Sequence, residues 1–178
     1  MLSISGTDKK PDKQPRPREP LHVPSSTKSS SYAAPRSDLI FGKANQGYTL
    51  ADFLPSKPAA DRVLAQFWHA VHPVTKVVHR PTFESQYSQF WGDISKGMEP
   101  VSAVQAMVFA VLFAASISMS EDMTLATFGV PQHRLVENFQ LATEMALGKA
   151  NFLKTTKTLT LQAFVMYMVC IRIWELPA

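Results

Sequence analysis

Three histidines, His69, His72 and His79, are the residues of this chain whose type and spacing first suggest chemistry. His69 and His72 lie about one helical turn apart, which would place both imidazoles on one side of a helix. A zinc site needs three or four ligands and commonly includes a cysteine or a carboxylate. Asp61 lies too far back on the same predicted helix, and Glu84 follows a further proline. We therefore predict no metal or cofactor site here, and expect the imidazoles to bond backbone groups at a helix end.

Nucleophilic catalysis also lacks support in the sequence. Cys170 is the only cysteine, and it lies in an apolar run where burial would raise its pKa and make the thiol inert. No serine has the G-x-S-x-G pattern, and the seven glycines are too scattered to form a phosphate-binding loop. Glu121 and Asp122 are adjacent carboxylates, which we expect to be solvated in a loop. The sequence thus predicts no catalytic residue and a chain that is not an enzyme.

Six aromatic residues between positions 67 and 91 offer another kind of site, because aromatic rings can stack on nucleic-acid bases. Their helical spacing and the lack of interleaved Lys and Arg favour packing against each other instead. They are Phe67, Trp68, Phe83, Tyr87, Phe90 and Trp91.

The positive charge of the chain is concentrated near its N-terminus. Residues 1–50 contain eight Lys or Arg and four Asp or Glu, whereas residues 51–178 contain ten of each. Binding to a phosphate backbone needs clustered basic residues, so the second part is a poor candidate for it. Residues 1–49 are rich in Pro, Ser and Lys and poor in large apolar side chains, which predicts a disordered linker before a globular domain over 50–178. A loose basic cluster over residues 9–18 could serve nuclear import or could be a solvated tail.

A single cysteine excludes an intrachain disulfide and a metal cage built from cysteines, and it fits a reducing intracellular compartment. The first residues also lack the apolar segment of a secretory signal.

The first helix is predicted to start near Ser56, a suitable cap, with Pro58 in its first turn. It is expected to end at His72, because the following proline, Pro73, disfavours the α conformation for the residue before it. The face that points inward is formed by residues at helical spacing, namely Ala60, Val63, Leu64, Phe67, Trp68 and Val71.

A short extended link, 74–79, is predicted to lead to a second helix. Thr82 is the expected N-cap of this helix, and its inner face would carry Phe83, Tyr87, Phe90 and Trp91. Gly92 and Gly97 are expected to bracket a polar loop after it.

A third helix is predicted from about Pro100 to Met119. Residues 101–119 contain no charged side chain, so a membrane-spanning helix is an alternative. Gln105 and several serines lie in this run, and no basic residues flank it, which favours a helix buried in a protein core.

Two further helices follow a mixed connection over residues 120–130. Pro131 is expected in the first turn of the fourth helix, whose inward residues are Leu135, Val136, Phe139, Ala142 and Ala146. The fifth helix is predicted over Leu161–Trp174, capped by Thr158 or Thr160. The whole pattern predicts an all-α helical domain.

This order of parts resembles the opening of the fungal-specific transcription factor domain, the regulatory middle homology region of zinc binuclear cluster (Zn2Cys6) regulators. Segments 150–153 and 159–163 resemble a later helix start of that family. The structural signature that carries the resemblance consists of His72, Pro73, His79, Arg80, Pro81, Thr82, Phe83 and Trp91.

The resemblance implies an all-α regulatory domain of a nuclear transcription factor. In that family DNA contact comes from an N-terminal six-cysteine cluster that holds two zinc ions. With one cysteine, this chain is expected to hold no zinc and to make no DNA contact of its own. The family domain would also continue beyond Ala178, so a truncated regulatory fragment is expected.

Three functions stay open at this point. The favoured one is a transcription factor regulatory fragment, whose effector the sequence does not identify. The alternatives are a helical interaction or inhibitory module that acts by heteroassociation, and a membrane-anchored helical protein. Because 101–119 and 161–174 are apolar on most sides, we also expect an exposed apolar patch that promotes self-association or partner binding.

Overall fold

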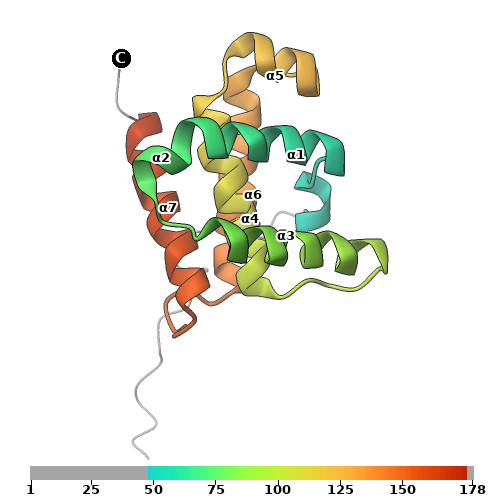
Figure 1. Cartoon of the computed structure of the whole chain (residues 1–178), viewed down its shortest axis with the longest axis vertical. Coiled ribbons are helices and arrows are strands. Elements are labelled where there is room, and N and C mark those ends of the chain that lie inside the picture. Colours follow the sequence, from blue (N-terminus) through green and yellow to red (C-terminus); the bar gives the residue numbers. More distant parts are fainter. Residues whose placement is uncertain (1–47, 176–178) are drawn as a thin grey trace, which may run out of the picture. The chain divides into compact units, whose positions relative to one another are not determined.

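All the regular structure in residues 48–175, which are the residues that the computed structural model describes, is helical (Figure 1). The all-α class predicted from the sequence is therefore confirmed. The predicted disordered linker, 1–49, lies outside the described residues except for Tyr48 and Thr49, and the domain boundary at residue 50 stays a prediction. The elements are a 3₁₀ turn η2 (Leu50–Phe53), α1 (Lys57–Gln66), a π-helical turn η3 (Phe67–Val71), α2 (His72–Thr75), α3 (Arg80–Ser95), α4 (Ser102–Ser118), α5 (Glu121–Phe128), α6 (Gln132–Lys149) and α7 (Thr158–Glu175).

The charge-free helix α4 is the one around which the others pack. It contacts α1, η3, α3, α6 and α7, and Figure 1 shows it in the middle of these helices. Every residue from Gln105 to Ser116 is buried. Such complete burial is possible because none of these residues is charged, and burying an unpaired charge would cost a large free energy. None of the helices within residues 48–175 combines the length and the apolar character needed to cross a membrane.

The first predicted helix does not stop at His72, so that prediction was wrong. His72 keeps an α conformation (φ −58°, ψ −39°), and the helical path continues through Pro73 to Thr75. The cause is the π turn: the backbone N–H of His72 donates to the carbonyl of Phe67, five residues back. This wider turn relieves the clash that a proline ring has with the preceding turn of an α-helix. The helix ends at Lys76, whose left-handed conformation (φ 47°) turns the chain.

The second predicted helix begins earlier than expected. α3 starts at Arg80 with His79 as its N-cap, so the prediction of Thr82 as the cap was wrong. Pro81 occupies the first turn, where its missing N–H costs nothing. The hydroxyl of Thr82 instead lies 2.8 Å from Nδ1 of His79. The helix also runs through Gly92, and the turn that follows is made at Gly97, where φ is +69°.

The predicted mixed connection over residues 120–130 contains a helix, α5. The Ser120 side chain caps it by accepting a hydrogen bond from the backbone N–H of Met123 at 3.3 Å. Glu121 is not merely solvated, because its carboxylate accepts a hydrogen bond from the backbone N–H of Gln132, the first residue of α6, at 2.9 Å. The inward residues predicted for the fourth helix are all buried in α6.

Helix α7 covers one side of α4 and leaves an apolar stripe uncovered. It starts at Thr158, three residues before the predicted start at Leu161. Its inner side chains, Ala163, Met166, Tyr167 and Cys170, are buried. The stripe on the other side, called the α7 stripe below, consists of Leu161, Val165, Met168, Val169 and Ile173, all of them exposed. The expected apolar patch thus exists on α7, whereas α4, the other helix expected to contribute, is covered.

Dye binding tests the α7 stripe directly. We expect the chain to bind the hydrophobic dye 8-anilinonaphthalene-1-sulfonate, and the double variant Val165→Gln/Val169→Gln to bind much less, because both side chains lie in the stripe. Glutamine is a good helix former, so α7 should stay helical by circular dichroism. The control is Val74→Gln, the same change at an exposed valine on α2. Equal dye fluorescence from the wild type and the double variant would contradict the prediction.

Candidate functional site

Three residues of the sequence signature, His72, Arg80 and Phe83, meet at the ring of Trp68 in η3. The His72 ring lies edge-on to it at 4.9 Å between centroids, and the Phe83 ring at 5.8 Å. The guanidinium of Arg80 lies 5.1 Å from the centre of the same indole, in cation–π range. We call this cluster, Trp68 with His72, Arg80 and Phe83, the aromatic corner. It joins the end of the first helical segment to the start of α3.

A row of rings continues from the aromatic corner along α3. Phe83 and Tyr87 are stacked at 5.9 Å, and Tyr87 meets Trp91 edge-on at 6.1 Å. The Tyr87 hydroxyl donates a hydrogen bond of 2.9 Å to Oδ1 of Asp61 on α1, which ties the two helices together. Burial raises the pKa of Tyr87 well above its ordinary value; the Trp91 indole opposes this shift, and the hydrogen bond and negative charge of Asp61 add to it.

The other signature residues lie at the surface. Pro73, His79, Pro81 and Thr82 are exposed, and each belongs to a helix end or first turn. Arg80 is also held by Glu84, with Nε and Oε1 2.7 Å apart. The signature is therefore a set of helix-end and packing residues.

The expectation that the imidazoles bond backbone groups was wrong for His72 and His79. His79 pairs with the Thr82 side chain, and Nδ1 of His72 is buried without a hydrogen-bond partner. Nor do these residues form a metal cage: nowhere in residues 48–175 do three His, Cys, Asp or Glu side chains converge as metal ligands.

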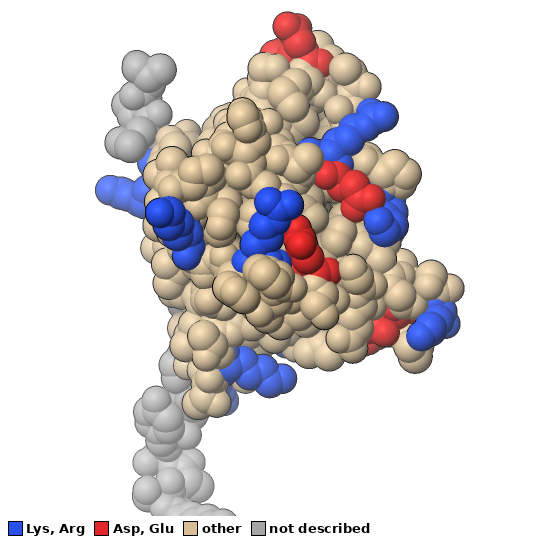
Figure 2. All heavy atoms as spheres, viewed as in Figure 1, with Lys and Arg blue, Asp and Glu red and all other residues tan. Residues whose placement is uncertain are grey.

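The aromatic rings of this region do not form a base-stacking surface, because Phe67, Phe83, Tyr87 and Phe90 are buried against other side chains. The charge distribution agrees. On the face shown in Figure 2, Lys and Arg residues are separated by uncharged surface and interspersed with acidic residues, so they form no continuous basic patch.

Cys170 faces the core from α7, as the sequence predicted. Its side chain is 4% exposed, and burial raises the pKa of the thiol to about 11. At neutral pH it is protonated, and a protonated thiol is neither a good nucleophile nor a metal ligand.

A cavity of about 420 Å³ at the far end of α3 is the feature that sequence analysis missed. It is open to solvent on one side and is lined by η2, the end of α3, the 97–100 turn, the first turn of α4 and the end of α6. Phe90, Gln105 and Phe109 form its buried part, and Met98, Glu99 and Lys149 lie at the exposed end. Glu99 and Lys149 form an ion pair across that end. The one signal in the sequence was Gln105 itself, an amide in an otherwise apolar run.

Comparisons with known proteins identify relatives of the chain. It is 28% identical over 169 residues to the aurofusarin cluster transcription factor aurR2 of Gibberella zeae, a match that covers 95% of this chain and 23% of that protein. It is 31% identical over 156 residues to the C6 finger domain transcription factor adaR of Aspergillus niger, covering 84% and 20%. With the C6 finger domain transcription factor nscR of Arthroderma gypseum it shares 37% over 116 residues, covering 61% and 16%.

No protein-family model and no solved structure matches the chain. The relatives are nonetheless of one kind, fungal transcription factors, several of them named for a C6 finger. The chain is thus homologous to part of zinc cluster transcription factors, which confirms the resemblance found in its sequence. It spans less than a quarter of the length of these three relatives.

Removal of a ring from the aromatic corner should cost stability, because the corner is a packing unit. We expect Phe83→Ala to lower the free energy of unfolding by about 3–5 kcal/mol, since Phe83 is buried between Trp68 and Tyr87. The control is Ser85→Ala on the exposed side of the same helix. It should change the free energy of unfolding by at most about 0.5 kcal/mol. Urea denaturation followed by circular dichroism measures both. A loss below about 1 kcal/mol for Phe83→Ala would contradict the packing role.

The buried thiol should make stability depend on pH. Because burial raises the pKa of Cys170 in the folded chain to about 11 from its ordinary value of 9.0, the unfolded chain loses this proton first as pH rises. The contribution of the protonated thiol to the free energy of unfolding is therefore fully present below pH 9 and is lost as pH rises towards 11. It amounts to about 2–3 kcal/mol. Cys170→Ala should lack it, so the difference in unfolding free energy between the wild type and this variant should shrink between pH 9 and pH 11. A constant difference would contradict the assignment.

Proposed function

We propose that the helical domain of this chain is a regulatory segment of a C6 finger transcription factor, active in the nucleus and not an enzyme. The observation that carries the proposal is the match to a transcription factor over 95% of the chain. The all-helical core supports the proposal. Within the described residues, the side chains that first suggested chemistry, such as Cys170 and Phe83, are buried in packing contacts.

The domain is proposed to act without direct DNA contact. One cysteine cannot form a six-cysteine finger, so zinc and DNA binding would reside in a cluster outside these 178 residues. The charge balance of the helical part supports this, since residues 51–175 carry ten basic and ten acidic side chains. A surface without clustered Lys or Arg binds a phosphate backbone weakly.

A fusion experiment tests the regulatory role. The chain is joined to an unrelated DNA-binding domain, and transcription of a reporter gene carrying that domain's site is measured in a filamentous fungus. We expect transcription to rise or fall relative to the DNA-binding domain alone. The variant Ala110→Asp should abolish the effect, because it buries an unpaired charge in α4 and unfolds the domain.

The matched control for this test is Ala65→Asp, the same substitution at an exposed position of α1. It should leave both the fold and the effect on transcription intact. Equal transcription from the fusion and from the DNA-binding domain alone, at equal protein levels, would contradict the proposed function.

A second candidate is an interaction module that regulates by heteroassociation. The exposed α7 stripe favours it, and the homology points to a full-length C6 finger regulator as the partner. In that case the unfused chain should co-purify with such a regulator and change its transcription, and Val165→Gln/Val169→Gln should weaken both. If the chain changes transcription only when fused and does not associate with the regulator, the first candidate is favoured.

A further inference from the structure

Gln105, a residue that lines the cavity at the end of α3, carries a buried hydrogen-bond acceptor that the protein leaves unused. Gln105 is 4% exposed, and its Nε2 donates a hydrogen bond of 2.7 Å to the carbonyl oxygen of Pro100. Its Oε1 has no partner. The amide cannot be turned over to exchange the two atoms, because the Pro100 oxygen only accepts and would then face a second acceptor. An unpaired buried acceptor is costly, so one on a side chain that lines a cavity needs an explanation.

The rest of the cavity is suited to an apolar molecule. Phe90 and Phe109 flank its buried part, and Leu50, Leu54 and Ile94 add further apolar surface. Its volume of about 420 Å³ lies within the range of small-molecule sites, which are mostly apolar and contain a few polar groups that orient the ligand. The charges nearest to it, Glu99 and Lys149, already neutralise each other at the exposed end.

We propose that this cavity binds an apolar aromatic small molecule that carries one hydroxyl group, and that this hydroxyl donates a hydrogen bond to Oε1 of Gln105. The aromatic body would lie between Phe90 and Phe109, and the hydroxyl would reach the first turn of α4. Because Oε1 has almost no accessible surface, the amide must turn slightly towards the cavity when the donor arrives. Its hydrogen bond to Pro100 serves as the pivot for that movement. This inference goes beyond the proposed function and does not depend on it, since it concerns binding to the purified chain.

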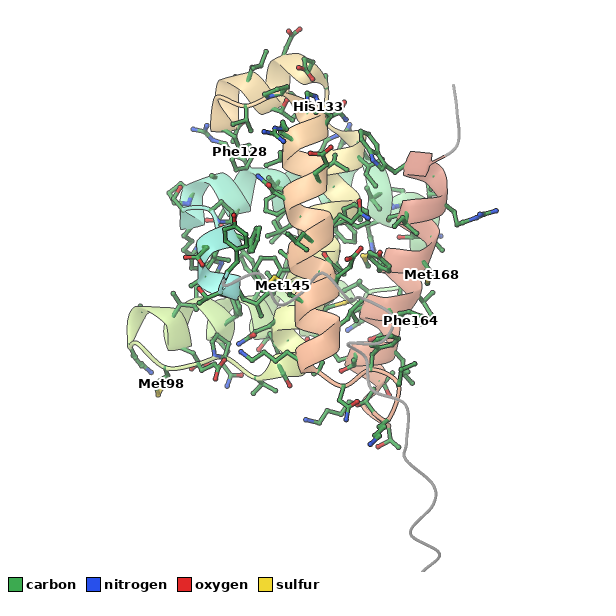
Figure 3. All side chains as sticks on the ribbon, turned by 180° about the vertical axis from the view of Figure 1, so that it is seen from behind. Met98, Phe128, His133, Met145, Phe164 and Met168 are labelled. Carbon is green, nitrogen blue, oxygen red and sulfur yellow. The ribbon has the colours of Figure 1, made fainter. Side chains whose placement is uncertain are left out.

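Methionine methyl groups report where such a molecule binds. Met98 lies at the exposed end of the cavity, and Met168 lies in the α7 stripe; Figure 3 shows the two on opposite sides of the domain. The full chain is labelled with ¹³C at its methionine methyls and titrated with 2-naphthol. We expect a saturable shift of the Met98 signal and none at Met168. A shift at Met168 alone, or no shift at Met98 up to the solubility limit of the probe, would overturn the proposal.

A matched probe isolates the hydrogen bond. The compound 2-methoxynaphthalene keeps the aromatic body and the oxygen but has no hydrogen to donate. We expect it to bind about tenfold more weakly than 2-naphthol, the usual effect of leaving a buried acceptor unpaired. Equal affinity for the two probes would overturn the role assigned to Oε1.

Two variants complete the test. Gln105→Met keeps the length of the side chain and removes the acceptor, so 2-naphthol should bind about tenfold more weakly and lose its advantage over 2-methoxynaphthalene. Gln89→Met, on the exposed side of α3, is the control and should change neither affinity.

Ala51→Trp fills the cavity from η2 and leaves Gln105 intact, and it should abolish the Met98 shift even if Gln105→Met fails to fold. Unchanged binding to the folded Ala51→Trp variant would overturn the location of the site.

Discussion

The constraint on which this structure depends is that α4 has to be covered on every side. Its residues from Gln105 to Ser116 are buried, and exposing such an uncharged helix to water would cost a large part of the stability of a small domain. Helices from both halves of the described chain meet that need: α1, η3 and α3 before α4, and α6 and α7 after it. The positions of the other elements follow from this covering of α4. They include the aromatic corner, where the first helical segment meets α3, and the cavity, where α3 ends.

The aromatic corner shows how groups able to do chemistry can be used for packing. The π turn lets the helix pass through Pro73 and brings Trp68 into contact with His72, Arg80 and Phe83. The side chains that could bind a metal or act as a base, such as His72 and His79, therefore pack against aromatic rings or lie exposed at helix ends. Tyr87 is fixed in the same way, by ring contacts and its bond to Asp61.

Two of the departures from complete packing within residues 48–175 underlie the binding proposals, and they lie in different places. One is Oε1 of Gln105, a polar atom with no partner on a side chain that lines an apolar cavity. The other is the α7 stripe, where apolar side chains face outward. Both are disfavoured in an isolated domain, the first because a buried acceptor has lost its water and the second because apolar surface orders water. Binding at either place would reduce that cost.

The sequence by itself determined the all-α class, the burial of the charge-free run, the inward face of α6 and the inert Cys170, because these follow from local periodicity and charge. It also determined the family resemblance, through residues near the aromatic corner. Tertiary structure decided what local rules could not. Pro73 should end a helix, yet a π turn that is packed on α4 accommodates it. The cavity and the partner of each buried polar atom arise from segments far apart in the chain, so only their meeting in space defines them.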